Sequence, residues 1–142
     1  MIVARSPGRY RQDTSLRGAG ITVTIMDPTA VRRLEEIGGS TLVITLVALV
    51  LEELPPRLAR VHAAIAAEDR AALGPAAHSL ISSTGNFGAF ELADLARGIE
   101  IASADAAWAT LAENAARLDD MTQEFLRELG EIHRRHKEPG DA

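Results

Sequence analysis

The sequence feature that most constrains the fold is a sustained apolar stripe in residues 105–136. Within this stretch apolar side chains recur every three or four positions, at Trp108, Leu111, Ala115, Leu118, Met121 or Thr122, Phe125, Leu129 and Ile132. A repeat of about 100° per residue is typical of an α-helix that buries one face. The stretch therefore predicts a long final helix, capped by Ser103 or Asp105.

Two helices are predicted before it in the N-terminal half. Asp27-Pro28 is a strong start, because the carboxylate can cap the first turn and proline suits the first helical position. Gly38-Gly39 ends this short element. The next helix, residues 41–67, is apolar on almost all sides over its first part, which predicts burial within a protein. Pro55-Pro56 interrupts it, and we expect a kink there rather than an end.

Two shorter helices follow in the middle of the chain. The first is capped by Asp69 and runs to about Thr84, with a distortion expected at Gly74-Pro75. The tight connection Gly85-Asn86-Phe87-Gly88 contains two glycines, both able to take a positive φ. The second helix is predicted over residues 89–102.

Together these elements predict an all-α domain over residues 26–136. We expect an antiparallel, up-down four-helix bundle with a short N-terminal capping helix and one Pro-kinked helix. Residues 1–25 show no helical period and are interpreted as a flexible basic tail, although Ile21–Ile25 alternates weakly like a short extended segment. A basic arm that binds acidic surfaces is the alternative for this tail. Residues 137–142 form a polar C-terminal tail, and the protein is expected to be a monomer.

Composition and charge exclude several functions. The net charge is −5, and the charge is uneven: residues 1–26 hold four arginines against Asp13, a net of +3, which leaves −8 on the rest. An acidic body with 4% aromatic residues argues against a nucleic-acid partner. The chain has no cysteine, which excludes disulfides, thiolate catalysis and Cys-based zinc sites.

The apolar segments are too short to indicate a membrane protein. The longest run, Thr41 to Leu51, falls short of the ~20 residues that a membrane-spanning helix needs. Ala19 to Met26 is only weakly apolar and is not followed by the small-residue cleavage site of a secretory signal. We therefore expect a soluble cytoplasmic protein without a membrane partner.

A single imidazole, His78, is the candidate functional residue. On a helical wheel it points away from the core side formed by Leu73, Ala77, Leu80 and Thr84. Its outward neighbours, Ser82 and Gly85 among them, are small, and only Ile81 is bulky. An imidazole in such surroundings is accessible to another protein, although most single histidines on a helix are ordinary surface residues.

The residues around His78 resemble the signature of histidine-containing phosphotransfer (HPt) domains. The run AAHSLISSTGNFGAFELADLARGIE matches that signature at Ala77, His78, Leu80, Ser83, Phe87, Gly88, Ala89, Ile99 and Glu100. The resemblance covers about residues 26–130. Ile81 stands where the family usually has lysine, which removes a positive charge near an incoming phosphoryl group. Ser82 stands where the family has glycine, and its small side chain preserves access.

The resemblance implies a phosphocarrier without an ATP site of its own, rather than an enzyme. His78 would accept a phosphoryl group from a receiver-domain aspartate through Nε2 and pass it to another receiver. Glu100 would accept from Nδ1–H and orient the ring, unless it is an ordinary solvated carboxylate at a helix end. Arg97, one turn earlier, is the nearest candidate to replace the lysine. Mg²⁺ would belong to the receiver, so no cofactor or metal is expected in this chain.

The expected partners are a response-regulator receiver domain and/or a hybrid histidine kinase. A second function class stays open: a degenerate HPt-like module that docks on a receiver or kinase without phosphotransfer, and so does not need His78. The sequence contains no phosphate-binding loop of the Walker or kinase type. His133 and His136 are spaced as a metal pair could be, but a basic helix end explains them better. His62 is expected at the surface or at a boundary.

Overall fold

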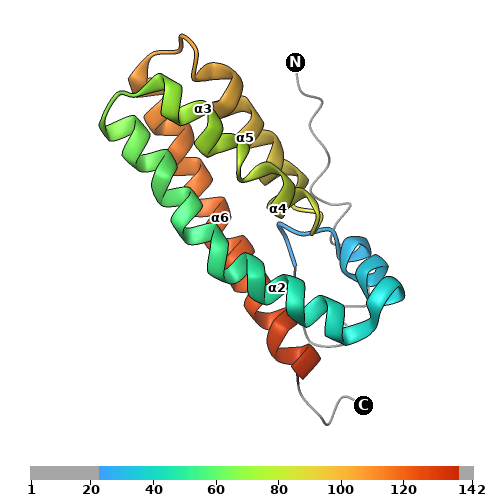
Figure 1. The fold of residues 1–142 in the computed structure, drawn as a ribbon. Helices are drawn as coiled ribbons and strands as arrows, with labels where there is room; N and C mark the ends of the chain where they lie inside the picture. The colour runs from blue at the N-terminus through green and yellow to red at the C-terminus, as the bar shows by residue number, and fades with distance from the viewer. Residues whose placement is uncertain (1–22, 138–142) are drawn as a thin grey trace.

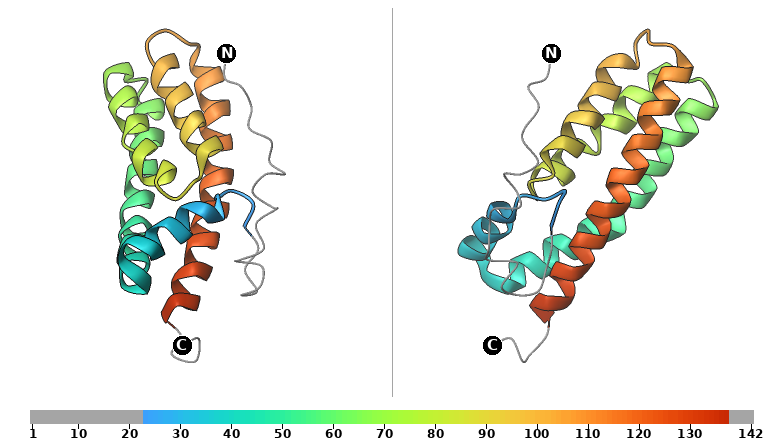
Figure 2. Two further views of the ribbon diagram at one scale, coloured as in Figure 1. Left: turned by 90° about the vertical axis from the view of Figure 1, so that its right-hand side faces the viewer. Right: turned by 180° about the vertical axis from the view of Figure 1, so that it is seen from behind.

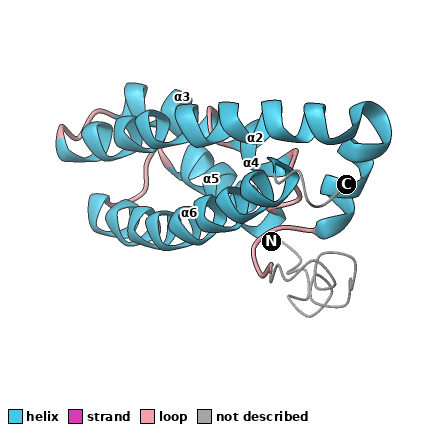
Figure 3. Cartoon of the chain, turned by 90° about the horizontal axis from the view of Figure 1, so that it is seen from below, coloured by secondary structure: helices cyan, strands magenta, loops and turns pink. Residues whose placement is uncertain are grey.

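The regular structure of the protein is entirely helical in the computed structural model, which describes residues 23–137 (Figure 1). The elements in order are α2 (Pro28–Ala66), α3 (Arg70–His78), α4 (Ile81–Gly85), α5 (Phe90–Ala102) and α6 (Trp108–Lys137). No strand occurs within residues 23–137, and short turns join the helices (Figure 3). The prediction of an all-α domain is confirmed.

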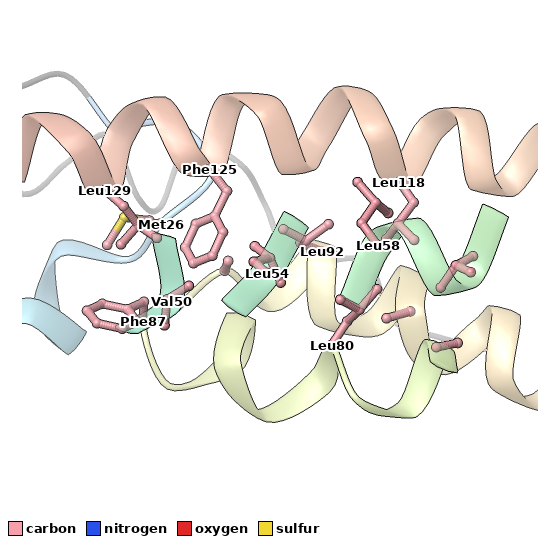
Figure 4. Packing of buried hydrophobic residues seen from close by; sticks show 14 of the residues in the cluster. Met26, Val50, Leu54, Leu58, Leu80, Phe87, Leu92, Leu118, Phe125 and Leu129 are labelled. Atoms are coloured by element: carbon pink, nitrogen blue, oxygen red, sulfur yellow. The ribbon is translucent and has the colours of Figure 1, made fainter. Parts of the chain in front are cut away.

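The helices enclose one core. α2 packs against both α6 and α3, while α5 packs against α3, α4 and α6, so the long elements form a closed ring of neighbours. The buried face of α6 is the predicted stripe: Leu111, Ala115, Leu118, Thr122, Phe125, Leu129 and Ile132. Toward one end of this core the rings of Phe87 and Phe125 meet edge to face, with their centroids 6.5 Å apart (Figure 4). The chain therefore folds as a helical bundle.

The start of α2 follows the sequence prediction, and so does the break at Gly38-Gly39, where the short first element was expected to end. Asp27 caps α2 by accepting a hydrogen bond from the Thr29 backbone N–H at 2.9 Å, and Pro28 occupies the first turn. The torsion angles leave the helical region at Gly39, where φ is 68° and ψ is −165°. Only glycine adopts such angles readily, so Gly39 separates residues 28–38 from residues 40–66 (Figure 1).

The prolines of α2 leave its torsion angles helical. Pro55 and Pro56 lie inside the helix, and Gly39 is its one residue with non-helical torsion angles. The expectation of a break in torsion angles at Pro55-Pro56, which would make a Pro-kinked helix, is therefore corrected: the one break within α2 lies at Gly39, which takes a positive φ.

α2 is long and apolar enough to cross a membrane by length and composition alone. Its most apolar 18-residue window has a mean hydropathy of 1.8, and 17% of that window is buried within the protein. Core helices of soluble proteins, which are mostly buried, and signal sequences near an N-terminus share this length and composition, so a single such helix is weak evidence for a membrane span. The buried residues of α2, from Val43 to Ala64, pack against α3 and α6.

The segment before α2 contributes to the core, although residues 1–25 were expected to form a tail. Val23 and Met26 are buried, and the segment lies against α6 (Figure 2). The backbone N–H groups of Thr24, Ile25 and Met26 donate to the carboxylate of Glu128, at 2.7, 3.0 and 3.1 Å. The packed body thus includes residues 23–25, while residues 1–22, the rest of the predicted tail, and residues 138–142 lie outside the described part.

Gly88 joins this N-terminal segment to the connection between α4 and α5. Its φ is 75°, whereas Gly85, for which a positive φ was also considered, simply ends α4. The Gly88 carbonyl accepts from the Asp27 N–H at 3.0 Å. A Cβ added to Gly88 would lie 2.6 Å from the Asp27 Cβ and 2.8 Å from its nitrogen. This position therefore requires glycine for two independent reasons.

We expect Gly88→Ala to lower the free energy of unfolding by about 2–3 kcal/mol, because the left-handed backbone and the collision with Asp27 both oppose a side chain. Gly98→Ala in α5 is the matched control, since a Cβ there meets nothing within 4 Å. It should stabilise the protein by about 0.5–1 kcal/mol through helix propensity. Urea unfolding of both variants measures the difference, and equal effects would contradict the packing of Gly88 against Asp27.

Candidate functional site

Helix α3 carries His78 as its last residue. Asp69 caps the helix by accepting from the Ala72 N–H at 3.1 Å. The sequence predicted that this helix would continue to about Thr84, and that prediction is wrong. α3 ends at His78, a turn occupies residues 79–80, and a separate short helix, α4, begins at Ile81. His78 therefore lies at a helix end.

Side-chain competition for backbone groups explains why the helix stops there. The Ser79 hydroxyl donates to the Ala76 carbonyl at 2.7 Å, a group that would otherwise accept from the Leu80 N–H. The Leu80 N–H donates instead to the Ala77 carbonyl at 3.1 Å, which tightens the last turn. α3 runs without interruption through Gly74-Pro75, where a distortion was expected, and the break comes instead immediately after His78.

The structure brings His78 and Glu100 together. The His78 Nδ1 lies 2.9 Å from Oε2 of Glu100, which belongs to the last turn of α5. The His78 side chain is 68% exposed, and that of Glu100 is 34% exposed. A carboxylate can only accept, so a neutral imidazole in this contact carries its proton on Nδ1 and keeps the lone pair on Nε2. The arrangement presents a nucleophilic nitrogen to solvent.

The other predicted site residues lie on two different helices. Ser82 is exposed and Ile81 half-buried in α4, and Gly85 is half-buried at the end of that helix. The helical wheel placed Ser82 and Gly85 beside His78 on one helix, whereas the structure separates them from α3 by the turn at residues 79–80. Arg97 is exposed on α5, where it pairs with Asp94 at 3.1 Å. Nothing in this geometry joins Arg97 to the imidazole.

Sequence reasoning missed Arg57 of α2. Its Nη1 donates to the Ser79 carbonyl at 3.0 Å, and its Nη2 pairs with Glu53 at 3.2 Å. This guanidinium therefore holds the turn that follows His78. Periodicity offered no signal for it, because the contact joins residues 22 positions apart.

An open groove of about 420 Å³ adjoins this turn between α2 and α3. Small apolar side chains dominate its lining, together with one cation and one carboxylate: Arg60, Ala63, Ala64, Ala67, Asp69, Ala72, Pro75, Ala76 and Ser79. The groove thus begins one residue from His78, on the side of α3 that faces α2.

Two of the other histidines, His62 and His136, have structural contacts. His136 Nδ1 lies 2.8 Å from the Ile132 carbonyl and its Nε2 lies 2.6 Å from Glu35, so both ring nitrogens of this member of the possible metal pair are engaged. His62 Nε2 lies 2.6 Å from Asp119 and bridges α2 and α6 at the surface. Within residues 23–137 no group of three His, Asp or Glu side chains is placed to hold a metal ion.

Comparison with known proteins identifies one family. The family model described as "Hpt domain" matches residues 45–130, a range that runs from α2 into α6 and includes His78, Arg57 and Glu100. No curated protein and no solved structure matches the chain.

Proposed function

Because the chain belongs to the Hpt domain family, whose members take part in phosphorelay signalling, we propose that His78 carries a phosphoryl group between receiver domains. The observation that supports this most directly is the exposed imidazole whose Nδ1 faces Glu100 at 2.9 Å. Members of the family are phosphocarrier modules rather than enzymes. We extend this to the chain itself, as a phosphocarrier that has no ATP site and acts on an already phosphorylated partner.

The chemistry needs little from the protein beyond a nucleophile. Nε2 of His78 attacks the phosphorus of the receiver's aspartyl phosphate, an N–P bond forms, and the P–O bond to the aspartate breaks. The aspartate leaves as a carboxylate, and the ring becomes a phosphorylated imidazolium that keeps its proton on Nδ1. Glu100 stabilises that positive charge, as a carboxylate does for the imidazolium in a catalytic triad. Attack by a second receiver's aspartate reverses the same bond changes.

The receiver supplies Mg²⁺ and the aspartate in this scheme, so the chain itself needs no cofactor. The partners are a response-regulator receiver domain and/or a hybrid histidine kinase, and the groove beside Ser79 offers a surface next to the imidazole. We further propose that the helices run up and down in antiparallel order with residues 28–38 as the capping helix, and that the protein acts as a cytoplasmic monomer.

The alternative function is docking without phosphotransfer. It is favoured by Ile81, whose neutral, half-buried side chain occupies the position of the family's lysine. Without that positive charge the negative charge of the phosphoryl group is less well compensated. A module of this kind would bind a receiver or kinase and leave His78 unmodified.

Labelling by a phosphorylated receiver decides between the two functions. The protein is mixed with a receiver carrying ³²P-aspartate and Mg²⁺, and the transferred label is tested for stability in acid and base. Phosphotransfer predicts an acid-labile, base-stable phosphoramidate on this chain. Stable binding of the receiver without any transferred label would establish the docking function instead.

We expect Ile81→Lys to increase the rate of labelling, because a cation close to the phosphoryl group stabilises the charge of the transition state. The gain is about tenfold for each ~1.4 kcal/mol of such stabilisation. Ile81→Met is the matched control, since it changes the same half-buried side chain without adding charge. Comparing the rates of label transfer for the two variants separates the effect of charge from the effect of packing. Equal rates would show that the charge at residue 81 does not affect transfer.

A further inference from the structure

The backbone that carries Glu100 is anchored by Ser103. Glu100 lies in the last turn of α5, where carbonyl groups lack partners within the helix. The Ser103 hydroxyl donates to the Glu100 carbonyl at 2.7 Å, and the Ser103 N–H donates to the Ile99 carbonyl at 2.9 Å. Ser103 is only 7% exposed, so these bonds are shielded from water.

Arg70 in turn fixes Ser103 from a different helix. Its Nη1 donates to the Ser103 carbonyl at 3.2 Å, and its guanidinium carbon lies 4.4 Å from the ring centroid of Trp108. Arg70 is the first residue of α3, and Trp108 is the first residue of α6. One guanidinium therefore joins α3, the end of α5 and the start of α6 through a hydrogen bond and a cation–π contact.

Gly74 allows α3 to approach this anchor closely. A Cβ on Gly74 would lie 3.1 Å from the Ser103 hydroxyl oxygen. Arg70, Gly74 and His78 are spaced four residues apart, so they lie along one face of α3. All three residues of this face are directed to the end of α5, two toward Ser103 and one toward Glu100.

The contact between His78 and Glu100 needs such support. Their side chains are 68% and 34% exposed, and an exposed ion pair or hydrogen bond holds its geometry weakly because water competes and both rotamers are free. Fixing the two backbones relative to each other removes part of that freedom before the side chains meet.

We propose that Arg70, Ser103 and Trp108 form a clamp that positions Glu100 against His78 and so selects the imidazole tautomer with the proton on Nδ1. The three are positioning residues, since they act through Glu100 and do not reach the phosphoryl group. The consequence for transfer rate rests on the function proposed above, whereas the consequence for the tautomer does not.

The test is the tautomer of His78 in the ¹⁵N-labelled full chain, read from the two ring-nitrogen chemical shifts above the pH at which the ring is protonated. In the wild type we expect the Nδ1–H tautomer to predominate. Arg70→Gln should shift His78 toward a mixture of tautomers and lower the rate of label transfer by about tenfold. Arg70→Lys, which keeps the charge but loses the planar stacking on Trp108, should lie between the two.

Two further variants keep the result interpretable. Arg117→Gln makes the same charge change at an exposed position of α6 and should leave the tautomer of His78 as in the wild type. Ser103→Ala removes only the hydroxyl, so it tests the clamp with little loss of packing if Arg70→Gln fails to fold. It should move His78 in the same direction by a smaller amount.

A wild-type tautomer ratio in both Arg70→Gln and Ser103→Ala would overturn the proposal, whatever the change in stability. A shifted tautomer without any labelling of the wild type would uphold the clamp and refute phosphotransfer. Labelling of the wild type with an unchanged tautomer in the variants would uphold phosphotransfer and refute the clamp. The two inferences can thus fail separately.

Discussion

His78→Gln is expected to abolish transfer of label from a phosphorylated receiver. Glutamine can still contact Glu100 through its amide, but its nitrogen has no available lone pair with which to form an N–P bond. The loss should therefore be complete rather than partial. The measurement is the acid-labile, base-stable label on this chain after mixing with the receiver and Mg²⁺.

His62→Gln provides the matched control for this experiment. His62 is also a surface histidine, but its Nε2 faces Asp119 at 2.6 Å and it bridges α2 and α6. This variant should accept label at the rate of the wild type. Label that persists in His78→Gln would place the acceptor at another residue and contradict the site described for α3 and α5.

Binding of the receiver separates loss of chemistry from loss of docking. If His78 is the acceptor, His78→Gln should still bind the receiver, because the groove beside Ser79 is lined by other residues. If the wild type is never labelled and both proteins bind equally well, the imidazole is unnecessary and the docking module is the correct function. The two measurements together leave one of the functions standing.

The helices were predictable because the information for them is local. The caps Asp27 and Asp69, the helix over residues 89–102 and the apolar stripe of α6 all follow from contacts within a few residues along the chain. The pairing of His78 with Glu100 was available only through the resemblance to a family, since no periodic pattern relates the end of one helix to the end of another.

Features that depend on contacts between distant segments could not be predicted in this way. The helix break after His78 depends on a serine hydroxyl and on Arg57, which is 22 residues away. The clamp from Arg70 to Ser103 spans 33 residues. The N-terminal segment was interpreted as a tail because its own sequence has no helical period, and its partner is more than 100 residues further on. Hydrophobic patterning identifies buried faces but does not identify the polar groups that bridge them.

Glu128 is the clearest of these hidden residues. Its carboxylate is fully buried, with a side chain 0% exposed, next to the predicted apolar stripe of α6. It accepts from three consecutive backbone N–H groups, those of Thr24, Ile25 and Met26, and also from the Thr24 hydroxyl at 3.0 Å. These amides have no helix or strand partner, so Glu128 is what allows the segment to lie against α6 while Met26 enters the core.

Glu128→Ala is expected to lower the free energy of unfolding by about 4 kcal/mol, because hydrogen bonds to a charged group contribute about 1.5–3 kcal/mol each and three buried or half-buried donors lose their acceptor together. The loss of unfolding free energy is limited because residues 23–26 can detach from α6, and their N–H groups can then bond to water. Glu128→Gln keeps the shape of the side chain, but its amide N–H₂ group would face backbone N–H donors. This variant should therefore lower the free energy of unfolding by about half as much as Glu128→Ala. Thermal melts should show a fall of about 10 °C for the alanine variant.

Glu124→Ala, one turn earlier on α6, is the control for this prediction. Glu124 is 37% exposed and pairs with Arg127, and this hydrogen bond is the main reason that the pKa of the Arg127 guanidinium is raised. Because exposed pairs contribute little, its removal should cost less than about 1 kcal/mol. Hydrogen exchange at the amides of residues 24–26 gives the decisive comparison: it should accelerate strongly in Glu128→Ala and stay slow in Glu124→Ala. Equal protection in the two variants would mean that these amides are held by burial alone, and that the carboxylate only fills space.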